Sequence, residues 1–281
     1  MIKPIRRLCQ VSCRAILFWV ASLVALPALA QPERPAFELV YFEDYAPFSY
    51  VEDGRLVGVL IEIMNEMLVT RLNLNVQHTG YPWARAQSLI RQGQADAFVT
   101  VPTDDRRVYA SFTEEPVLRA PFRLFVSARD VNNSDMLAVR EFADLKSFSL
   151  GGYIGSGWIK TVLEETHGLS VSYAPDLQSA LRMLAAERTQ IVIENAAVVR
   201  HNIRVAGLGG HIAELPVELA NPSWHLGISH HSTFMGKTEL FNQTLQSMWS
   251  DGTIPCILSR YEVQSIEKAG LNCKEVRISN D

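Results

Sequence analysis

The sequence predicts an α/β protein with largely parallel sheets, divided into two lobes. Short apolar runs alternate with amphipathic stretches almost throughout its 281 residues, a rhythm typical of strands that alternate with helices. The roughly 250 residues that follow position 30 exceed a typical single domain, which favours two domains. No low-complexity segment or linker separates them, so we expect the chain to cross between the lobes more than once.

Each half of the chain shows the same order of strand, helix, strand, helix, strand. The first helix has the clearest pattern, because Ile61, Met64, Met67 or Leu68, and Leu72 recur at helical spacing. In the first half the predicted elements span residues 37–42, 58–72, 74–78, 83–92 and 95–101. In the second half they span residues 148–153, 156–166, 170–173, 177–187 and 190–194.

One helix and strand of the first half align without gaps on a helix and strand of the second, residues 86–101 on 180–195. Few positions are identical, so the two segments are either a structural repeat or two ordinary units of helix and strand. If they are a repeat, Thr100-Val101 and Glu194-Asn195 occupy equivalent positions at the carboxyl ends of two strands. Open α/β sheets bind ligands at such ends, so the pairs would face each other across a cleft.

The first thirty residues predict a signal peptide. Four basic residues accompany an uncharged apolar run at 15–26, and Ala28-Leu29-Ala30 has the small residues of a cleavage site. We expect cleavage after Ala30 and export to the periplasm, with a retained signal anchor as the alternative.

Charge and cysteine content restrict the partners. Removing the leader removes four of 26 basic residues and none of 30 acidic ones, so the charge becomes 22 − 30 = −8. Such a balance argues against nucleic acid as a partner. Cys256 and Cys273 remain, and in an oxidising compartment such a pair is more often a disulfide than a metal or catalytic site; two unpaired thiols are the alternative. The seven histidines show no metal-ligand spacing, and we expect neither a metal nor a cofactor.

Short motifs follow one another in a recognisable order and spacing. They are Tyr45-Ala-Pro-Phe48, Asp53-Gly-Arg-Leu-Val-Gly58, Gly93-Gln-Ala-Asp96, Thr103-Asp-Asp-Arg106, Phe112-Thr-Glu-Glu-Pro116, Phe142-Ala-Asp-Leu-Lys146, Gly155-Ser156 and Asp251-Gly-Thr253. Through them the chain, from about residue 37 to 261, resembles the periplasmic amino-acid-binding proteins, the family 3 solute-binding components of ABC importers.

The resemblance implies a periplasmic-binding-protein-like fold, with two α/β lobes, two hinge crossings and a ligand cleft between the lobes. The crossings are expected near residues 116–120 and 219–224. Lobe one would comprise residues 31–117 and 223–281, including the C-terminal tail, and lobe two residues 118–222. It also implies a monomer that closes about its hinges on a small molecule and docks on an inner-membrane permease or sensor.

The resemblance also assigns residues to the ligand. Arg106 would grip a carboxylate with its planar guanidinium, where the alternative is an arginine on the surface. Tyr45 and Trp83 would sandwich the body of the ligand; the alternative is that they are ordinary core residues. Gly155 and Ser156 would complete the carboxylate site at a helix N-terminus; the alternative is a tight turn that simply needs glycine.

Two departures from the family pattern concern the ligand's carboxylate and ammonium groups. Asn195 stands where relatives that bind standard amino acids usually carry an aspartate for the α-ammonium. Val99 and Val101 flank Thr100 where hydroxyl residues often bond the ligand. Glu194 is adjacent to Asn195, but neighbours on a strand face opposite sides unless the strand has ended. The ligand is therefore expected to lack a free α-ammonium, to carry a modified one, or to be a small organic acid.

Three functions remain in competition. The leading one is a receptor that delivers a carboxylate-bearing, amino-acid-like solute to an ABC importer. The second is a ligand sensor of a signalling system, which needs the same cleft and hinge. The third is an exported enzyme on the same fold, with Glu194 as its acid or base.

Overall fold

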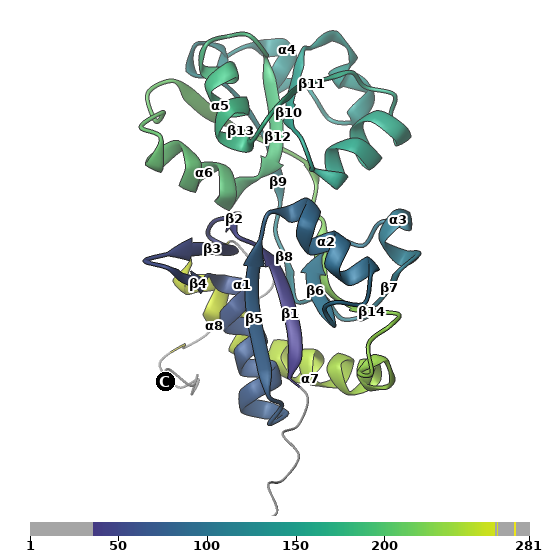
Figure 1. Ribbon diagram of the computed structural model, residues 1–281. Helices are drawn as coiled ribbons and strands as arrows, with labels where there is room; N and C mark the ends of the chain where they lie inside the picture. Colours follow the sequence, from purple (N-terminus) through teal and green to yellow (C-terminus); the bar gives the residue numbers. More distant parts are fainter. Residues whose placement is uncertain (1–35, 262, 264–272, 274–281) are drawn as a thin grey trace, which may run out of the picture. The chain divides into compact units, whose positions relative to one another are not determined.

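Two mixed β-sheets organise the computed structural model, which describes residues 36–261, 263 and 273 (Figure 1). The first sheet has the strand order β5-β1-β6-β14-β7, with β8 also paired to β14. β1 is parallel to β5 and β6, whereas β14 runs antiparallel to β6, β7 and β8. The strands are β1 (Phe37–Phe42), β5 (Val76–Tyr81), β6 (Ala97–Thr100), β7 (Ala110–Phe112), β8 (Leu118–Arg119) and β14 (Ser223–Ser229).

Both faces of this sheet are covered, which explains why its central strands β1 and β6 are mostly apolar. In β1, Leu39 and Tyr41 join the larger core, whereas Val40 packs in a second core with Phe98 and Ile90. The second core lies under α2 (Trp83–Arg91). The larger core on the other face includes α1 (Val59–Met64), its π-helical continuation η1 (Asn65–Arg71), α7 (Thr238–Ser250) and α8 (Thr253–Arg260).

The second sheet has the order β11-β10-β12-β9-β13. β10 is parallel to β11 and β12, and β9 is antiparallel to both β12 and β13. Its strands are β9 (Phe122–Ser127), β10 (Leu150–Tyr153), β11 (Val171–Ala174), β12 (Ile191–Asn195) and β13 (Ile212–Ala220). The helices of this part are η2 (Ala128–Asp130), α4 (Ser134–Leu137), η3 (Phe142–Ser147), the π-helical η4 (Ile159–Thr166), α5 (Leu177–Ala185) and α6 (Ala196–Val205).

Smaller elements complete the description. Strands β2 (Asp44–Tyr45), β3 (Ser49–Glu52) and β4 (Arg55–Val57) form a three-stranded antiparallel sheet. α3 (Asp104–Arg107) follows β6, and η5 (Met235–Lys237) precedes α7. None of the helices within the described residues is long and apolar enough to span a membrane.

The chain passes between the two sheets twice, at neighbouring places. It leaves the first sheet between β8 and β9 and returns between β13 and β14. The two passages are hydrogen-bonded: Ala120 N donates to Pro222 O (3.4 Å) and Val117 N to Trp224 O (2.7 Å). The first sheet thus contains strands from before the first crossing and after the second. The second sheet consists only of strands that lie between the two crossings.

The predicted elements of the two repeating halves are present, with shifted ends. The helix predicted to end at residue 72 ends at Arg71, and Asn73 after it takes a left-handed conformation (φ 49°). The strand predicted at 74–78 is β5 at Val76–Tyr81, which begins two residues later than expected. The predicted parallel pairing holds for β5-β1-β6 and for β11-β10-β12, and the remaining strands pair antiparallel. The small sheet β2-β3-β4 was not predicted.

Two sequence predictions concern the ends of the chain. The signal peptide at residues 1–30 lies outside the described residues. Cys256, in α8, and Cys273 are joined in a disulfide. The bond ties Cys273 to the last described helix.

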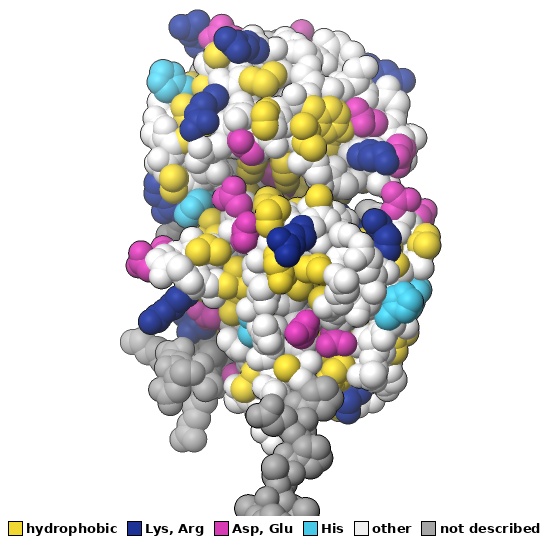
Figure 2. Space-filling model, viewed as in Figure 1, with side chains coloured by type: hydrophobic (Ala, Val, Ile, Leu, Met, Phe, Trp, Pro, Cys, Tyr) yellow, Lys and Arg dark blue, Asp and Glu magenta, His cyan; other side chains and the backbone are white. Residues whose placement is uncertain are grey.

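On the face drawn in Figure 2, the basic side chains are scattered among acidic ones.

Gly227 in β14 offers a test of how tightly the second core is packed. A Cβ at this position would lie 2.5 Å from Phe98 Cε1 and 2.7 Å from Phe112 Cε1, whereas one at exposed Gly209 would meet nothing within 4 Å. Gly227→Ala should lower the free energy of unfolding by about 1–3 kcal/mol, the usual cost of overpacking. Urea denaturation should show this loss, with Gly209→Ala near wild type; equal values for both variants would contradict the packing.

Candidate functional site

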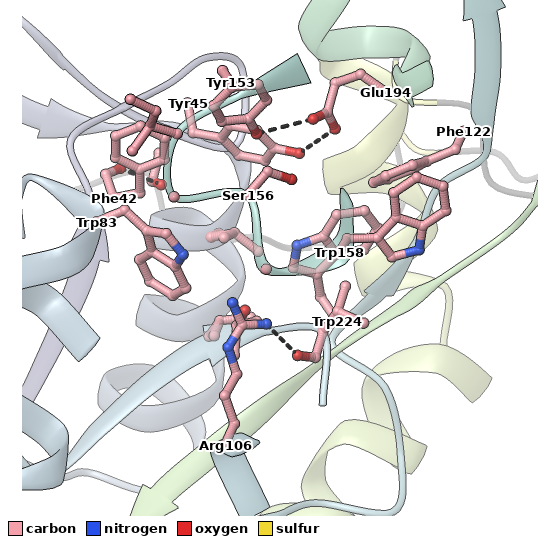
Figure 3. A pocket seen from close by; sticks show the side chains of 18 residues that line it. Phe42, Tyr45, Trp83, Arg106, Phe122, Tyr153, Ser156, Trp158, Glu194 and Trp224 are labelled. Carbon is pink, nitrogen blue, oxygen red and sulfur yellow. Dashed lines mark hydrogen bonds between the residues drawn. The ribbon is translucent and has the colours of Figure 1, made fainter. Parts of the chain in front are cut away.

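A cavity lies between the carboxyl ends of strands from the two sheets (Figure 3). β6 contributes residues to it from the first sheet, and β10 and β12 contribute residues from the second. Most of its wall is aromatic or apolar. The lining residues are Phe42, Tyr45, Ser49, Leu60, Trp83, Val99, Thr100, Val101, Arg106, Phe122, Tyr153, Ile154, Gly155, Ser156, Gly157, Trp158, Glu194 and Trp224.

Arg106 is held at one end of the cavity by the segment that follows β6. It lies in α3, and the side chain of Thr103, the residue before this helix, accepts a hydrogen bond from the backbone N–H of Arg106. The guanidinium donates from Nη1 to Val101 O (2.7 Å) and from Nε to Gln87 Oε1 (3.2 Å). Its Cζ lies 5.3 Å from the centre of the Trp83 ring. These contacts fix the plane of the guanidinium and leave Nη2 directed at the opposite wall.

The charge of Arg106 is buried, with 5% of the side chain exposed. Burial lowers the pKa of its guanidinium from the ordinary value, although an arginine stays charged at physiological pH. Among the residues that the structure describes, no carboxylate forms an ion pair with it. A desolvated cation without a counter-ion favours an anion that enters the cavity.

The turn between β10 and η4 faces this guanidinium. Gly155 has a φ of 93°, a conformation that favours glycine. A Cβ on Gly157 would lie 2.8 Å from Arg106 Nη2, so the absent side chain is what allows the two lobes to approach here. Ser156 Oγ accepts from the backbone N–H of Ile159 (3.4 Å) at the start of the helix. A helix start exposes unpaired N–H groups, so this turn adds to the attraction for an anion.

Glu194 lies at the other end of the cavity and is also buried, with 1% exposed. Its Oε1 accepts from Tyr45 Oη (2.9 Å) and from Asn195 N (2.7 Å), and its Oε2 accepts from Tyr153 Oη (2.9 Å). Burial raises the pKa of the Glu194 carboxyl, and the three hydrogen bonds offset part of the rise. Because Tyr45 belongs to β2 and Glu194 to β12, their hydrogen bond joins the two sides of the cavity.

Asn195 does not line the cavity, contrary to the sequence prediction. Its side chain is fully buried, and its Oδ1 accepts from Ala197 N (3.0 Å) and Val198 N (3.3 Å). Strand β12 ends at this residue, and the side chain caps the N-terminus of α6. The physical reason is that the first N–H groups of a helix have no partner within the helix, and the carboxamide oxygen of Asn195 accepts from two of them.

The structure brings the other predicted residues together. The side chains or backbone of Tyr45, Trp83, Thr100, Val101, Arg106, Gly155, Ser156 and Glu194 all line the cavity. Sequence reasoning missed Phe122, Tyr153, Trp158 and Trp224. Two of these could have been found: Tyr153 ends the strand before the Gly155 turn, and Trp224 lies at the second expected crossing.

Three of the missed aromatic residues, Phe122, Trp158 and Trp224, pack with Phe48 in a group of rings beside the crossings. The rings of Phe48 and Trp224 are nearly parallel, at 5.5 Å and 11°. Phe122 lies 6.0 Å from Trp224 and 4.5 Å from Trp158. Phe122 is the first residue of β9 in the second sheet, and Trp224 lies at the start of β14 in the first, so these rings link the two sides next to the connecting segments.

The structure is thus that of a two-lobed solute-binding protein, with a cleft between α/β sheets joined by two crossings. The chain belongs to the bacterial extracellular solute-binding proteins, family 3, whose sequence profile matches residues 38–264. No curated protein matches this sequence.

Solved structures share the fold at low sequence identity. The arginine-, lysine-, histidine-binding protein ArtJ from Geobacillus stearothermophilus is 15% identical, with a TM-score of 0.65 over 83% of this chain and 97% of that chain. The amino acid ABC transporter substrate-binding protein AbpA from Streptococcus pneumoniae, bound to L-arginine, is 18% identical, with a TM-score of 0.64 over 82% and 97%. A histidine kinase sensor domain with similarity to periplasmic binding proteins is 15% identical, with a TM-score of 0.68 over 83% and 98%.

The raised pKa of Glu194 predicts a pH dependence of stability. The folded protein keeps a proton on this carboxyl at a higher pH than the unfolded chain does. The resulting stabilisation is complete below the unfolded pKa and is lost as the pH rises through the folded pKa. When the pH falls from 7 to 5, the unfolding free energy of the ligand-free wild type should therefore rise relative to that of Glu194→Gln. Urea denaturation of both proteins at the two pH values measures the difference. An equal change of the unfolding free energy in both proteins would refute the prediction.

Proposed function

We propose that this protein is a receptor for a small carboxylate-bearing, amino-acid-like solute, which it binds reversibly by closing two lobes around the cavity. The observation that carries the proposal is Arg106. Its guanidinium is buried, oriented by Val101 and Gln87, without a carboxylate partner among the described residues, and next to the glycine turn. A planar guanidinium binds a carboxylate bidentately, and the turn supplies further N–H donors.

We propose that the lobes are residues 31–117 with 223–281, and residues 118–222, and that the protein acts as a monomer. The hydrogen-bonded passages at Ala120 and Pro222 support hinges at these places. Residues 1–30 are proposed as a signal peptide that is removed after Ala30, which would place the protein in the periplasm. There the loaded protein would deliver its solute to an ABC importer in the inner membrane.

A sensor role is the second candidate. The likeness to a histidine kinase sensor domain favours it, since the same fold serves there as part of a signalling protein. Both roles need only a ligand that binds the closed form better than the open form. Co-purification of the loaded protein with a membrane permease would support import, and co-purification with a sensor kinase would support signalling.

We propose binding without chemistry in either role. Glu194 is the one candidate acid or base considered for an enzyme, and its oxygens already accept hydrogen bonds from Tyr45, Tyr153 and the backbone. A bound ligand recovered from the protein should have an unchanged mass after prolonged incubation. Conversion of the ligand, lost in Glu194→Gln, would establish the enzyme instead.

Arg106→Ala is expected to abolish the response to carboxylates. Residues 31–281 would be screened by thermal unfolding against amino acids, their N-modified relatives, polyamines and small carboxylates. A ligand at 100 times its Kd stabilises by about 2.7 kcal/mol, and loss of a buried carboxylate partner costs about 2–5 kcal/mol of affinity.

The matched control is Arg107→Ala. Arg107 is the next residue, is exposed, and lies over Phe112 outside the cavity lining. It should keep the wild-type response, whereas Arg106→Ala should lose it. A carboxylate that stabilises Arg106→Ala as much as the wild type would overturn the proposal, as would a screen in which no carboxylate acts.

Gly157→Ala tests the same site from the opposite lobe. The added methyl group would meet Arg106 Nη2 at 2.8 Å, so the guanidinium must move from its place beside the turn. Carboxylate affinity, measured by isothermal titration calorimetry, should fall by at least about tenfold, equivalent to about 1.4 kcal/mol. The melting temperature without ligand should change little, because the guanidinium is the end of a flexible side chain. Unchanged affinity would show that the turn takes no part in binding.

A further inference from the structure

The cavity contains a buried guanidinium and a buried carboxyl group that do not neutralise each other. Arg106 comes from the segment after β6 and Glu194 from β12, and no ion pair joins them. Figure 3 shows them on different sides of the cavity, with Ser156 and Trp158 drawn between them. A ligand that matches both charges has an anionic end at Arg106 and a cationic end at Glu194.

Glu194 supplies charge at its end of the cavity but little capacity to accept hydrogen bonds. A carboxylate has about four acceptor positions. Three are taken by Tyr45 Oη, Tyr153 Oη and Asn195 N. The neighbouring Asn195 Oδ1 is also occupied, by the two N–H groups of α6 that it caps. A primary ammonium group carries three N–H donors, and donors left unpaired in a buried cavity are costly.

Aromatic residues also belong to this end of the cavity. The hydroxyls of Tyr45 and Tyr153 point to Glu194 (Figure 3), and Phe122 of β9 pairs with Asn195, the next residue along β12. Phe122 and Trp158 pack against each other at 4.5 Å, and both line the cavity. Aromatic faces attract cations that have lost their water, and groups of such rings recognise quaternary ammonium ions.

We propose that the ligand is a carboxylate that carries a quaternary ammonium group, with the carboxylate at Arg106 and the trimethylammonium group among the aromatic rings near Glu194. A quaternary ammonium has no N–H, so the occupied oxygens of Glu194 cost it nothing, while its charge offsets that of Glu194. The proposal rests on the proposed function, because it uses the same cavity and the same contact with Arg106.

The test compares ligands that share a carbon skeleton by isothermal titration calorimetry. On the acetate skeleton they are trimethylammonioacetate, its uncharged isostere 3,3-dimethylbutyrate, and glycine. On the butyrate skeleton they are 4-(trimethylammonio)butyrate, 5,5-dimethylhexanoate and 4-aminobutyrate. On at least one skeleton the quaternary ammonium compound should bind at least about tenfold more tightly than both of its partners.

Two variants assign the preference to the residues named here. Glu194→Gln keeps the size of the side chain and should remove the advantage of the quaternary ammonium over its isostere, with little change for the isostere. Tyr153→Phe keeps the ring and frees an acceptor position on Glu194, so it should raise the affinity for the primary ammonium relative to the quaternary one. Circular dichroism and the melting temperature of both variants establish that they are folded.

The outcomes separate this proposal from the proposed function. Tightest binding by glycine or 4-aminobutyrate, equal binding by the isosteres, or no binding by either quaternary compound would overturn the quaternary ammonium assignment. In each case the proposed function as a carboxylate receptor is retained if another carboxylate binds the wild type but does not bind the Arg106→Ala variant. If no carboxylate depends on Arg106, the proposed function falls as well.

Discussion

The pairing of β14 with β6 is the constraint on which the rest of the structure depends. β14 comes after the whole second sheet in the sequence, yet its residues pair with β6 and β7 of the first. The chain must therefore leave the first sheet and return to it, and the two passages lie hydrogen-bonded to each other. This arrangement sets the end of β6 opposite the ends of β10 and β12. Because parallel strands bind ligands at their carboxyl ends, the double passage creates the cavity.

Two buried ionisable groups that lack a partner of opposite charge among the described residues give the cavity its chemistry. Arg106 and Glu194 are both buried, and each is oriented by uncharged partners, Val101 and Gln87 for one and two tyrosines for the other. Such contacts hold a charge in place without cancelling it, so the charge stays available to a ligand. The hydrogen bond from Tyr45 to Glu194 also ties the two sides together, which makes closure and recognition parts of one arrangement.

Much of the fold and part of the site could be predicted from local patterns. The alternation of strands and helices was visible because burial on both faces makes a parallel strand such as Phe37–Phe42 mostly apolar. Arg106 was found through its motif and lies in the cavity. The same reasoning placed Asn195 in the cleft, but its side chain caps α6. The sequence alone does not show which of the neighbours Glu194 and Asn195 faces the cavity and which caps the helix.

The sequence by itself determined the class of fold, the order of most elements, the family and the position of the arginine, because each depends on residues close together in the chain. Only the tertiary structure decided which charges share a cavity and what they contact. Glu194 meets Tyr45 across 149 residues, and Gly157 meets Arg106 across the two lobes. Such contacts arise from the return of β14 to the first sheet, and no local pattern records a pairing that the chain makes only after folding.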